Sequence, residues 1–303
     1  VYCTYVDNSI HYDVTGRVAP CCQFRGNDEP TYVTPTEYFN SDWLANIKKQ
    51  MNNNEYIEGC KRCYNDEQIS GRSLRTDGNS KNIKKLHFAY SNICNKSCNI
   101  CIPQRSHLVG SDYKKVLDND PNDYFMQEKF ARQKFTEEII DSGNLKLESI
   151  VDCIKTDEIK KHLHKFNQIE FNGGEPFMHP ELHRILDMLK EENYQGRLSF
   201  TTNGSVSKEY LDKIAKFNDV FIEISIDGVK NLYKVVRPPH DYEWFVDKMQ
   251  LINQYTSIKK IWHYVVHVFN VHQIPDIIEE SIKLNIDCDY GALGQQEYLH
   301  ASL

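Results

Sequence analysis

Three cysteines stand close together in residues 91–101, SNICNKSCNIC: Cys94, Cys98 and Cys101. A structural zinc site closes its tetrahedron with four ligands, so three cysteines are too few for one. Offsets of four and three residues also suit one face of a helix, where the cysteines could be core residues. A cubane iron–sulfur cluster held by three thiolates keeps one iron free for another ligand. The spacing therefore favours a cluster with an open iron, with zinc and core cysteine as alternatives.

The residues around these cysteines predict a loop rather than a helix. Several have side chains that compete with the backbone for hydrogen bonds: Ser91, Asn92, Asn95, Ser97 and Asn99. In the preceding segment, KKLHFAYS (84–91), apolar residues occupy alternate positions, as they do in a strand. We therefore place the three cysteines on a loop that follows the end of a strand.

This C-x3-C-x2-C motif after a strand resembles the signature of the radical S-adenosylmethionine (SAM) enzymes. The resemblance implies that Cys94, Cys98 and Cys101 hold a [4Fe–4S] cluster whose open iron binds the amino and carboxyl groups of SAM. In that family the reduced cluster cleaves SAM, and the resulting 5′-deoxyadenosyl radical abstracts hydrogen from the substrate. Ile100 stands where the family commonly has an aromatic residue, and an apolar side chain can still shield the cluster.

Composition fits a cofactor enzyme of ordinary size. The 303 residues, 40% of them hydrophobic, can form one barrel-like domain or a large and a small domain. The net charge of −7 gives no support for binding to nucleic acid or to an anionic membrane. Neither a long apolar run nor a signal-peptide pattern is present, so we expect a soluble, cytoplasmic protein. Most of the ten cysteines lie in metal-like spacings, which favours a reducing compartment, whereas Cys153 and Cys288 read as buried residues.

From residue 84 onward, strand-like and helix-like patterns alternate, which predicts an α/β fold with a parallel sheet. Six runs read as strands: 84–91, 167–172, 197–202, 219–226, 261–269 and 286–292. The order is similar to the partial (β/α)6 barrel of the radical SAM family, which we expect over residues 81–303. The stretch at about 103–165 is too long for one connection and predicts a helical insertion.

The segment FNGGEPFMHP (171–180) follows the second strand of this barrel. Asn-Gly between apolar runs could form a hairpin, but the helical periodicity of PELHRILDMLKEE (180–192) predicts a strand, a turn and a helix. Glycine lets the backbone approach a ligand closely. The segment resembles the GGEP motif of radical SAM enzymes, which implies that Gly173, Gly174, Glu175 and Pro176 contact SAM near its methionine amino group.

Two further strand ends carry polar residues that suit the same pocket. TTNG (201–204) contains Asn203, and in SIDG (225–228) Ser225 and Asp227 point to the same side of an extended strand. Turn and cap roles are the alternatives for these residues. The resemblance implies that the SIDG strand end contacts the SAM ribose and that Arg237 pairs with the SAM carboxylate.

Residues 1–80 do not follow the strand–helix pattern and hold four cysteines in two groups: Cys3, Cys21, Cys60 and Cys63. Four thiolates are what a closed tetrahedral site requires, and the spacing allows either zinc or an iron–sulfur cluster. Cys22 is an alternative to Cys21. The spacing of Cys3, Gly16 and Cys21 resembles the opening motif of the SPASM and twitch modules, which hold auxiliary clusters.

The resemblance to those modules implies an auxiliary iron–sulfur cluster in residues 1–80, with zinc as the alternative, although such modules usually follow the barrel. An electron-exchanging cluster must lie near the barrel mouth, so we expect this module over the carboxyl ends of the strands. We interpret the chain as a radical SAM oxidoreductase that takes electrons from a donor such as flavodoxin or ferredoxin. The expected substrate is a peptide or protein. The alternatives are a small molecule (sugar, nucleoside or cofactor precursor) and a non-enzymatic zinc-binding protein on the same fold.

Overall fold

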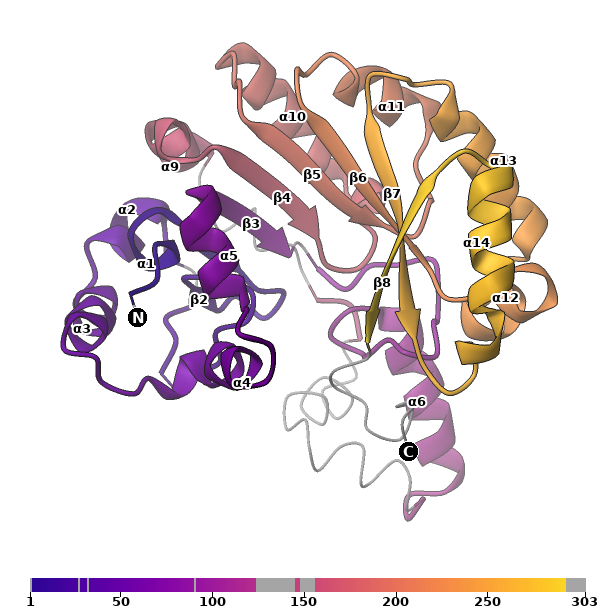
Figure 1. The fold of residues 1–303 in the computed structure, drawn as a ribbon, viewed down its shortest axis with the longest axis horizontal. Helices are drawn as coiled ribbons and strands as arrows, with labels where there is room; N and C mark the ends of the chain where they lie inside the picture. Colours follow the sequence, from indigo (N-terminus) through magenta and orange to yellow (C-terminus); the bar gives the residue numbers. More distant parts are fainter. Residues whose placement is uncertain are drawn as a thin grey trace.

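The computed structural model describes residues 2–26, 28–31, 33–89, 91–123, 145–147 and 156–292. A single sheet runs through the described part of the chain, in the order β2-β1-β3-β4-β5-β6-β7-β8 (Figure 1). Its strands are β1 (Ile10–Tyr12), β2 (Val18–Ala19), β3 (Lys85–Ala89), β4 (Gln168–Asn172), β5 (Arg197–Thr202), β6 (Val220–Ile226), β7 (Lys259–Val266) and β8 (Asp287–Ala292). β1 and β2 pair antiparallel, and every other neighbouring pair is parallel.

Strands β3 to β8 are the six strands that the sequence predicts, so the α/β fold with a parallel sheet is confirmed. The largest difference is in β7, which ends at Val266 instead of residue 269. The chain turns there because the side chain of Asn270 accepts a hydrogen bond from the His267 backbone N–H at 2.7 Å. The backbone N–H of Asn270 also donates to the His267 carbonyl at 3.0 Å.

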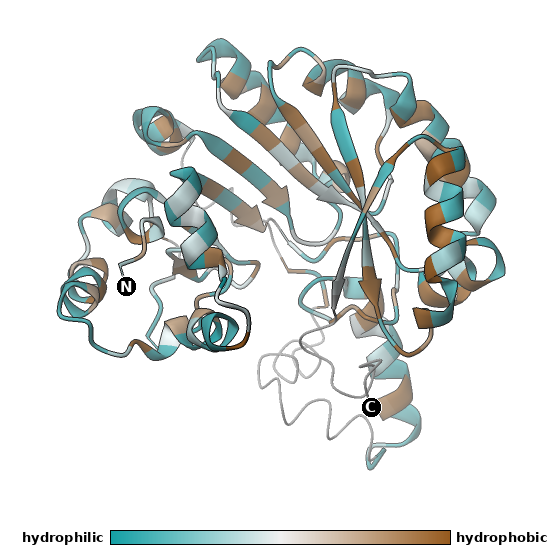
Figure 2. Ribbon diagram, viewed as in Figure 1, coloured by the Kyte–Doolittle hydropathy of each residue, from teal (hydrophilic) through white to brown (hydrophobic). Residues whose placement is uncertain are grey.

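The two faces of the sheet differ in polarity, and the strands in Figure 2 alternate between hydrophobic and hydrophilic residues. The outer face is apolar: Phe88, Phe171 and Phe200 stack across adjacent strands, with ring centroids 5.9 and 5.0 Å apart. Helices cover this face (Figure 1), namely α10 (Pro180–Glu191), α11 (Lys208–Ile214), α12 (Lys230–Val236), α13 (Tyr242–Asn253) and α14 (Ile274–Lys283). The concave face carries polar residues, with His87 paired in register to Glu170.

The N-terminal segment joins this sheet through β1, which pairs in parallel with β3. Its helices are α1 (Tyr5–Asn8), α2 (Pro35–Phe39), α3 (Asp42–Asn52), η1 (Glu58–Cys60), α4 (Lys61–Ser70) and α5 (Leu74–Lys81). We expected this segment over the carboxyl ends of the strands, whereas the structure attaches it to the edge of the sheet beside β3 (Figure 1). One hydrophobic core continues from Cys3 to Ile286, so the division at residue 80 stays a prediction.

The predicted insertion at about 103–165 is described only in part. Its described elements are α6 (His107–Asn119), α9 (Thr156–His162) and the 3-10 helix η3 (Leu163–Lys165), and the 3-10 helices η4 (Pro176–Met178) and η5 (Val271–Gln273) lie further along the chain. Cys153 lies outside the described residues, whereas Cys288, predicted to be buried, is only partly buried on β8. Among the helices that the structure describes, none is both long and apolar enough to cross a membrane.

Candidate active site

The three cysteines after β3 line one cavity at the carboxyl ends of the strands. Cys94 and Cys98 are buried, and Cys101 is partly buried. The cavity has about 830 Å³ of empty space, part of which is open to solvent. Ligands of parallel α/β folds bind at this end of the strands. The cysteine loop and the strand ends therefore form one site, as the sequence predicts.

Hydrogen bonds hold the cysteine loop in place, and several come from the polar residues that predicted a loop. The Asn92 side chain donates to the Pro103 and Leu145 carbonyls, each at 2.8 Å. The backbone N–H groups of Ser97 and Asn99 donate to the Pro238 and Val236 carbonyls at 2.9 and 3.0 Å. The loop is thereby attached to the chain that follows α12, which positions its thiols rigidly.

Burial controls the ionisation of these thiols. It raises the pKa of Cys94 to about 12, with nearby Glu175 and Cys98 adding to the effect. Burial also raises the pKa of Cys98 and Cys101, while the Arg237 guanidinium opposes the rise at Cys98. Only a thiolate binds metal strongly, so binding here requires proton loss that a positively charged metal group must drive.

The arrangement of the three cysteines suits a cubane cluster. In the described residues, no group of three or more His, Cys, Asp and Glu side chains converges closely enough to hold one metal ion. Cys94, Cys98 and Cys101 instead surround a shared cavity. A cubane cluster needs this arrangement because each thiolate binds a different iron. The Asn203 side chain donates to Cys94 Sγ at 3.5 Å and adds a hydrogen bond to one of the sulfurs.

The two glycines of the GGEP segment line the same cavity. Gly173 and Gly174 have positive φ angles of 82° and 57°. A Cβ atom on Gly174 would lie 2.2 Å from the Ile93 carbonyl oxygen, and one on Gly173 would lie 2.9 Å from Ala89 Cα. These glycines therefore let the GGEP segment pack against the cysteine loop, in addition to any approach to a ligand.

Glu175 and Pro176 are buried and do not contribute to the cavity wall. The Glu175 carboxylate accepts hydrogen bonds from Thr202 Oγ1 and the Asn203 backbone N–H, both at 2.7 Å, and from the Phe177 N–H at 3.3 Å. Burial raises the pKa of Glu175, and these donors oppose the rise. Glu175 thus joins the GGEP segment to the end of β5, and direct contact of Glu175 or Pro176 with SAM stays a prediction.

Asn203, Ser225, Asp227 and Arg237 all line the cavity, as the sequence predicts. Arg237 Nη1 donates to Asp227 Oδ2 at 2.5 Å, and both side chains are buried. The sequence assigned these two residues to separate parts of SAM, whereas the structure pairs them. Asp227 Oδ1 and Arg237 Nε have no hydrogen-bond partner in the described part of the chain, so the pair keeps one acceptor and one donor.

Sequence reasoning missed part of the cavity wall: Arg105, Asn172, Thr201, Thr202 and Val265. Asn172 and Thr202 end β4 and β5, and this position was a usable signal because parallel strand ends meet at one edge. Arg105 follows the last cysteine of the loop, and its Nη1 lies 3.4 Å from Asn172 Oδ1. No sequence pattern marks Arg105, because its placement depends on how the loop folds back onto β4.

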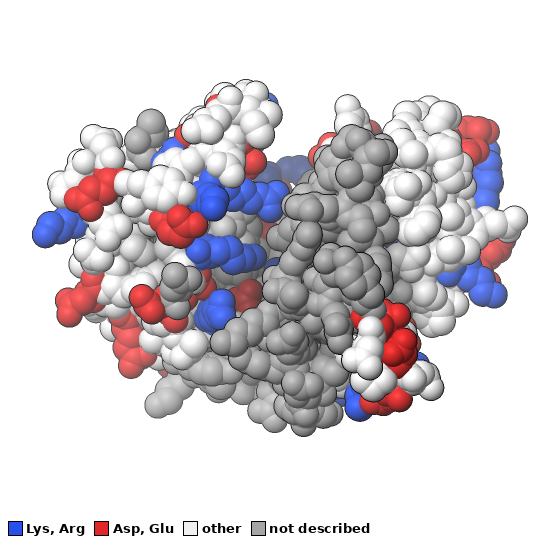
Figure 3. Space-filling model, turned by 90° about the horizontal axis from the view of Figure 1, so that it is seen from below, with Lys and Arg blue, Asp and Glu red and all other residues white. Residues whose placement is uncertain are grey.

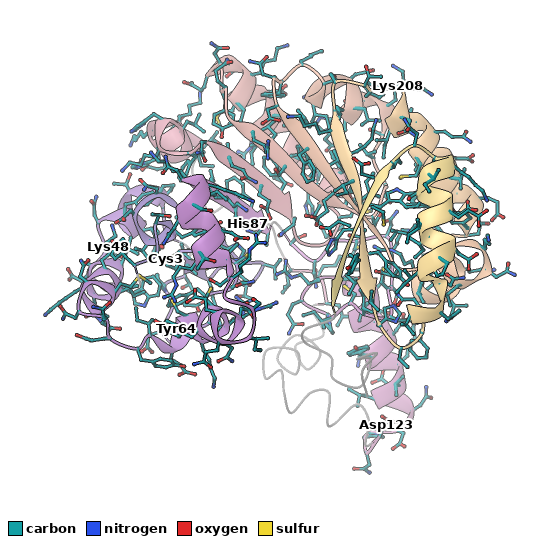
Figure 4. The ribbon with its side chains drawn as sticks, in the orientation of Figure 1. Cys3, Lys48, Tyr64, His87, Asp123 and Lys208 are labelled. Carbon is teal, nitrogen blue, oxygen red and sulfur yellow. The ribbon has the colours of Figure 1, made fainter. Side chains whose placement is uncertain are left out.

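Cys3, Cys21, Cys60 and Cys63 line a second cavity, inside the N-terminal segment, with about 410 Å³ of empty space. Figure 4 shows Cys3 within this segment. Burial raises the pKa of Cys3 to about 11 and that of Cys60 to about 12. Cys22 lies outside this wall and lines an adjoining cavity with Cys21. The structure therefore brings together the four cysteines that the sequence groups.

Comparison with known proteins identifies the family. The model of the radical SAM superfamily matches residues 88–280. GTP 3′,8-cyclase of Staphylococcus carnosus (strain TM300) is 22% identical over 156 residues, which cover 52% of this chain and 37% of that protein. The 7-carboxy-7-deazaguanine synthase of Aquifex aeolicus (strain VF5) is 33% identical over 107 residues, which cover 34% of this chain and 44% of that protein. The matches thus span less than half the length of either relative.

Among solved structures, native anSMEcpe with bound AdoMet and Cp18Cys peptide gives a TM-score of 0.48 at 15% identity, covering 71% of this chain and 54% of that chain. Streptococcus suis SuiB bound to S-adenosylmethionine gives 0.45 at 14% identity, covering 88% and 55%. The family match extends from β3 into α14 and contains the cysteine loop, the GGEP segment and the polar ends of β5 and β6. This chain is therefore an enzyme of the radical SAM superfamily.

Proposed function

We propose that this chain uses a [4Fe–4S] cluster at Cys94, Cys98 and Cys101 to cleave SAM and modify a peptide or protein. The observation that carries the proposal is that these three thiols share one cavity with the polar ends of β4, β5 and β6. When bound, the cluster and SAM supply an electron and a 5′-deoxyadenosyl radical. Flavodoxin or ferredoxin is the class of electron donor that we expect.

The cavity wall supplies polar groups that suit SAM. The Asp227–Arg237 pair keeps one carboxylate oxygen and one guanidinium N–H without a partner among the described residues. The ribose hydroxyls can donate to the oxygen, and the SAM carboxylate can accept from the N–H, without breaking the pair. Ser225 and Asn203 add a hydroxyl and an amide on the same wall. Gly173 and Gly174 expose backbone there, and Glu175 holds the neighbouring strand end in place.

For the N-terminal cavity we propose an auxiliary iron–sulfur cluster held by Cys3, Cys21, Cys60 and Cys63. Four thiolates would complete the coordination, so this cluster would transfer electrons instead of binding SAM. The four cysteines line one cavity, which supports a shared site. Zinc remains the alternative metal, because four thiolates can also hold a zinc ion.

The substrate assignment has two candidates. The first candidate is a peptide or protein. Radical SAM enzymes with an auxiliary cluster often act on this substrate class, and our proposal rests on that association. A small molecule is the second candidate, because the two curated relatives are named for GTP and for 7-carboxy-7-deazaguanine. Since the chain belongs to an enzyme superfamily, we do not retain the zinc-binding non-enzyme.

Anaerobic reconstitution tests the proposal. The protein should bind iron and sulfide, show cluster absorption that bleaches on reduction, and convert SAM to 5′-deoxyadenosine and methionine. A peptide encoded beside the gene should accelerate cleavage and change in mass, whereas GTP should do neither. Absence of SAM cleavage in reduced, iron-loaded protein would refute the function, and acceleration by GTP alone would favour the small-molecule candidate.

A further inference from the structure

Lys96 lies in the cysteine loop, between Cys94 and Cys98, and its side chain is 0% exposed. Charged side chains usually reach solvent, as the Lys, Arg, Asp and Glu residues do on the face shown in Figure 3. No other lysine in the described part of the chain is buried. Because removing an ammonium group from water is costly, the groups around Lys96 must compensate for the lost hydration.

Two aromatic rings and one hydroxyl surround the Lys96 ammonium. Its Nζ lies 4.1 Å from the centre of the Trp244 ring and 4.9 Å from the centre of the Tyr233 ring. Nζ also donates a hydrogen bond to the Tyr233 hydroxyl at 3.1 Å. Tyr233 is part of α12 and Trp244 is part of α13, so this side chain connects the cysteine loop to both helices.

No carboxylate neutralises this ammonium within the part of the chain that the structure describes. Lys96 forms no ion pair there, and its polar contact is the Tyr233 hydroxyl. The faces of the two rings attract a cation, but an uncharged ring does not neutralise it. Fully buried lysines are almost always paired with an anion. The described side chains therefore leave the charge of Lys96 without a counter-charge.

The cluster that we propose on this loop would supply the counter-charge. Lys96 is two residues from Cys94 and two from Cys98, so the Cα atoms are within roughly 7 Å of each other. Three thiolates around a dipositive cubane core give a net negative charge, which grows when the core accepts an electron. Buried charges are screened much less than exposed ones, so the ammonium would attract the cluster across the loop.

The position of Lys96 separates this effect from SAM binding. Tyr233 is one helical turn before Arg237, whose side chain lines the cavity of the three cysteines, whereas Lys96 does not line that cavity. The Ser106 hydroxyl donates to the Lys96 carbonyl at 2.7 Å and helps to fix the loop backbone. Lys96 is therefore held behind the cavity wall, where it would act on the cluster without touching SAM.

We infer that Lys96 is an electrostatic partner of the cluster, held by Tyr233 and Trp244, that stabilises the reduced state and so raises the reduction potential. The inference rests on the proposed function, because it assumes a cluster at Cys94, Cys98 and Cys101. The electron comes from the donor proposed above. The inference adds that the loop itself carries a fixed positive charge that makes this electron transfer more favourable.

A redox titration of the reconstituted full chain without SAM tests the inference. Absorption and electron paramagnetic resonance follow reduction, and the signal that SAM alters in a parallel sample identifies this cluster. Lys96→Met keeps the length of the side chain, and methionine packs well against aromatic rings. In this variant the reduction equilibrium should shift at least about tenfold toward the oxidised cluster, which is about 59 mV for one electron.

Two matched variants should stay within about threefold of the unchanged protein. Lys96→Arg keeps the charge and can keep the contacts with the rings. Lys248→Met removes another lysine beside Trp244, whose Nζ lies 5.7 Å from the ring centre, but Lys248 is partly exposed and therefore screened by solvent. An unchanged potential in Lys96→Met overturns the inference. An equal fall in Lys96→Met and Lys96→Arg also overturns it, because packing and not charge would then set the potential.

Trp244→Leu keeps the test decisive if Lys96→Met does not assemble a cluster. Trp244 is partly exposed and lies outside the loop, so water should replace its ring and screen the ammonium. The potential should then fall by less than in Lys96→Met, and an unchanged potential overturns the inference. Failure of the proposed function is distinguishable, because the unchanged protein would then lack iron and cluster absorption.

Discussion

The two groups of cysteines occupy very different surroundings. Cys94, Cys98 and Cys101 come from one loop, and their cavity has a wall of hydroxyl, amide and charged side chains at strand ends. Cys3, Cys21, Cys60 and Cys63 come from three separate segments, and their cavity has about half the empty volume and a mainly apolar wall. Burial raises thiol pKa values in both. The number of thiols and the polarity of the wall, not thiol acidity, therefore distinguish the two cavities. We propose the first as a site open to a further ligand (the open site) and the second as a fully ligated one (the closed site).

The largest effect should follow from breaking the open site. Cys94→Ala, Cys98→Ala or Cys101→Ala removes one of three thiolates, so SAM cleavage should fall to background in a 5′-deoxyadenosine assay. The control is Cys288→Ala, which removes a partly buried cysteine on β8. SAM cleavage by the triple alanine variant would show that this loop does not hold the cluster.

The closed site should respond differently. The unchanged protein should carry about eight irons per chain, the sum of two four-iron clusters. Cys60→Ala with Cys63→Ala should remove about half of this iron, because the two remaining thiolates cannot hold a cluster. The electron paramagnetic resonance signal that responds to SAM should persist. Four irons with one zinc in the unchanged protein would decide for a structural zinc site.

A third change affects the wall of the open site without removing a cysteine. Glu175→Ala leaves the Thr202 hydroxyl and the Asn203 N–H without their buried acceptor. The predicted contact of Glu175 with the SAM amino group would be lost as well. Loss of a hydrogen bond to a charged group costs about 1.5 to 3 kcal/mol, so SAM affinity should fall roughly ten- to a hundredfold. Titration calorimetry measures the affinity, and the cluster spectrum should be unchanged. Glu191→Ala, at an exposed position of α10, is the control. An unaltered affinity would leave Glu175 with no role in SAM binding.

The smallest effect concerns the helices around the closed site. Ser73 caps α5, accepting the Thr76 N–H at 3.2 Å, and its hydroxyl donates to Glu67 at 2.5 Å. Ser73→Ala should lower the free energy of unfolding by about 1 kcal/mol, as for other lost N-caps. Thermal unfolding measures this change, with Ser80→Ala in the same helix as the control. Equal melting temperatures for the two variants would show that the cap does not stabilise this segment.

The sequence predicted the open site more completely than its surroundings. Alternating or continuous apolar runs identified β3 to β8, and strand-end positions identified Asn203, Ser225 and Asp227. It did not predict β1, because a fully buried strand of three residues shows no alternation. The Asp227–Arg237 pair was also missed, since the two residues are ten positions apart and the chain between them gives no indication of which side chains meet.

The N-terminal segment could be assigned only by its cysteines. Spacing grouped Cys3, Cys21, Cys60 and Cys63, and the structure places all four around one cavity. Spacing could not choose between Cys21 and Cys22, because adjacent residues differ only in the direction of their side chains. Cys21 lines both neighbouring cavities, whereas Cys22 lines only the smaller one. This difference depends on how the turn after β2 packs, which no local pattern encodes.

The pairing of β1 with β3 has a consequence for any attempt to divide the protein. β3 leads directly into the cysteine loop, and β1 covers its outer edge with backbone hydrogen bonds. A chain shortened to begin at residue 81 would present that edge to solvent as a row of unpaired N–H and C=O groups. Such an edge is a template for pairing with other chains, so the isolated barrel should self-associate. The N-terminal segment therefore also protects the edge of β3 from pairing with other chains.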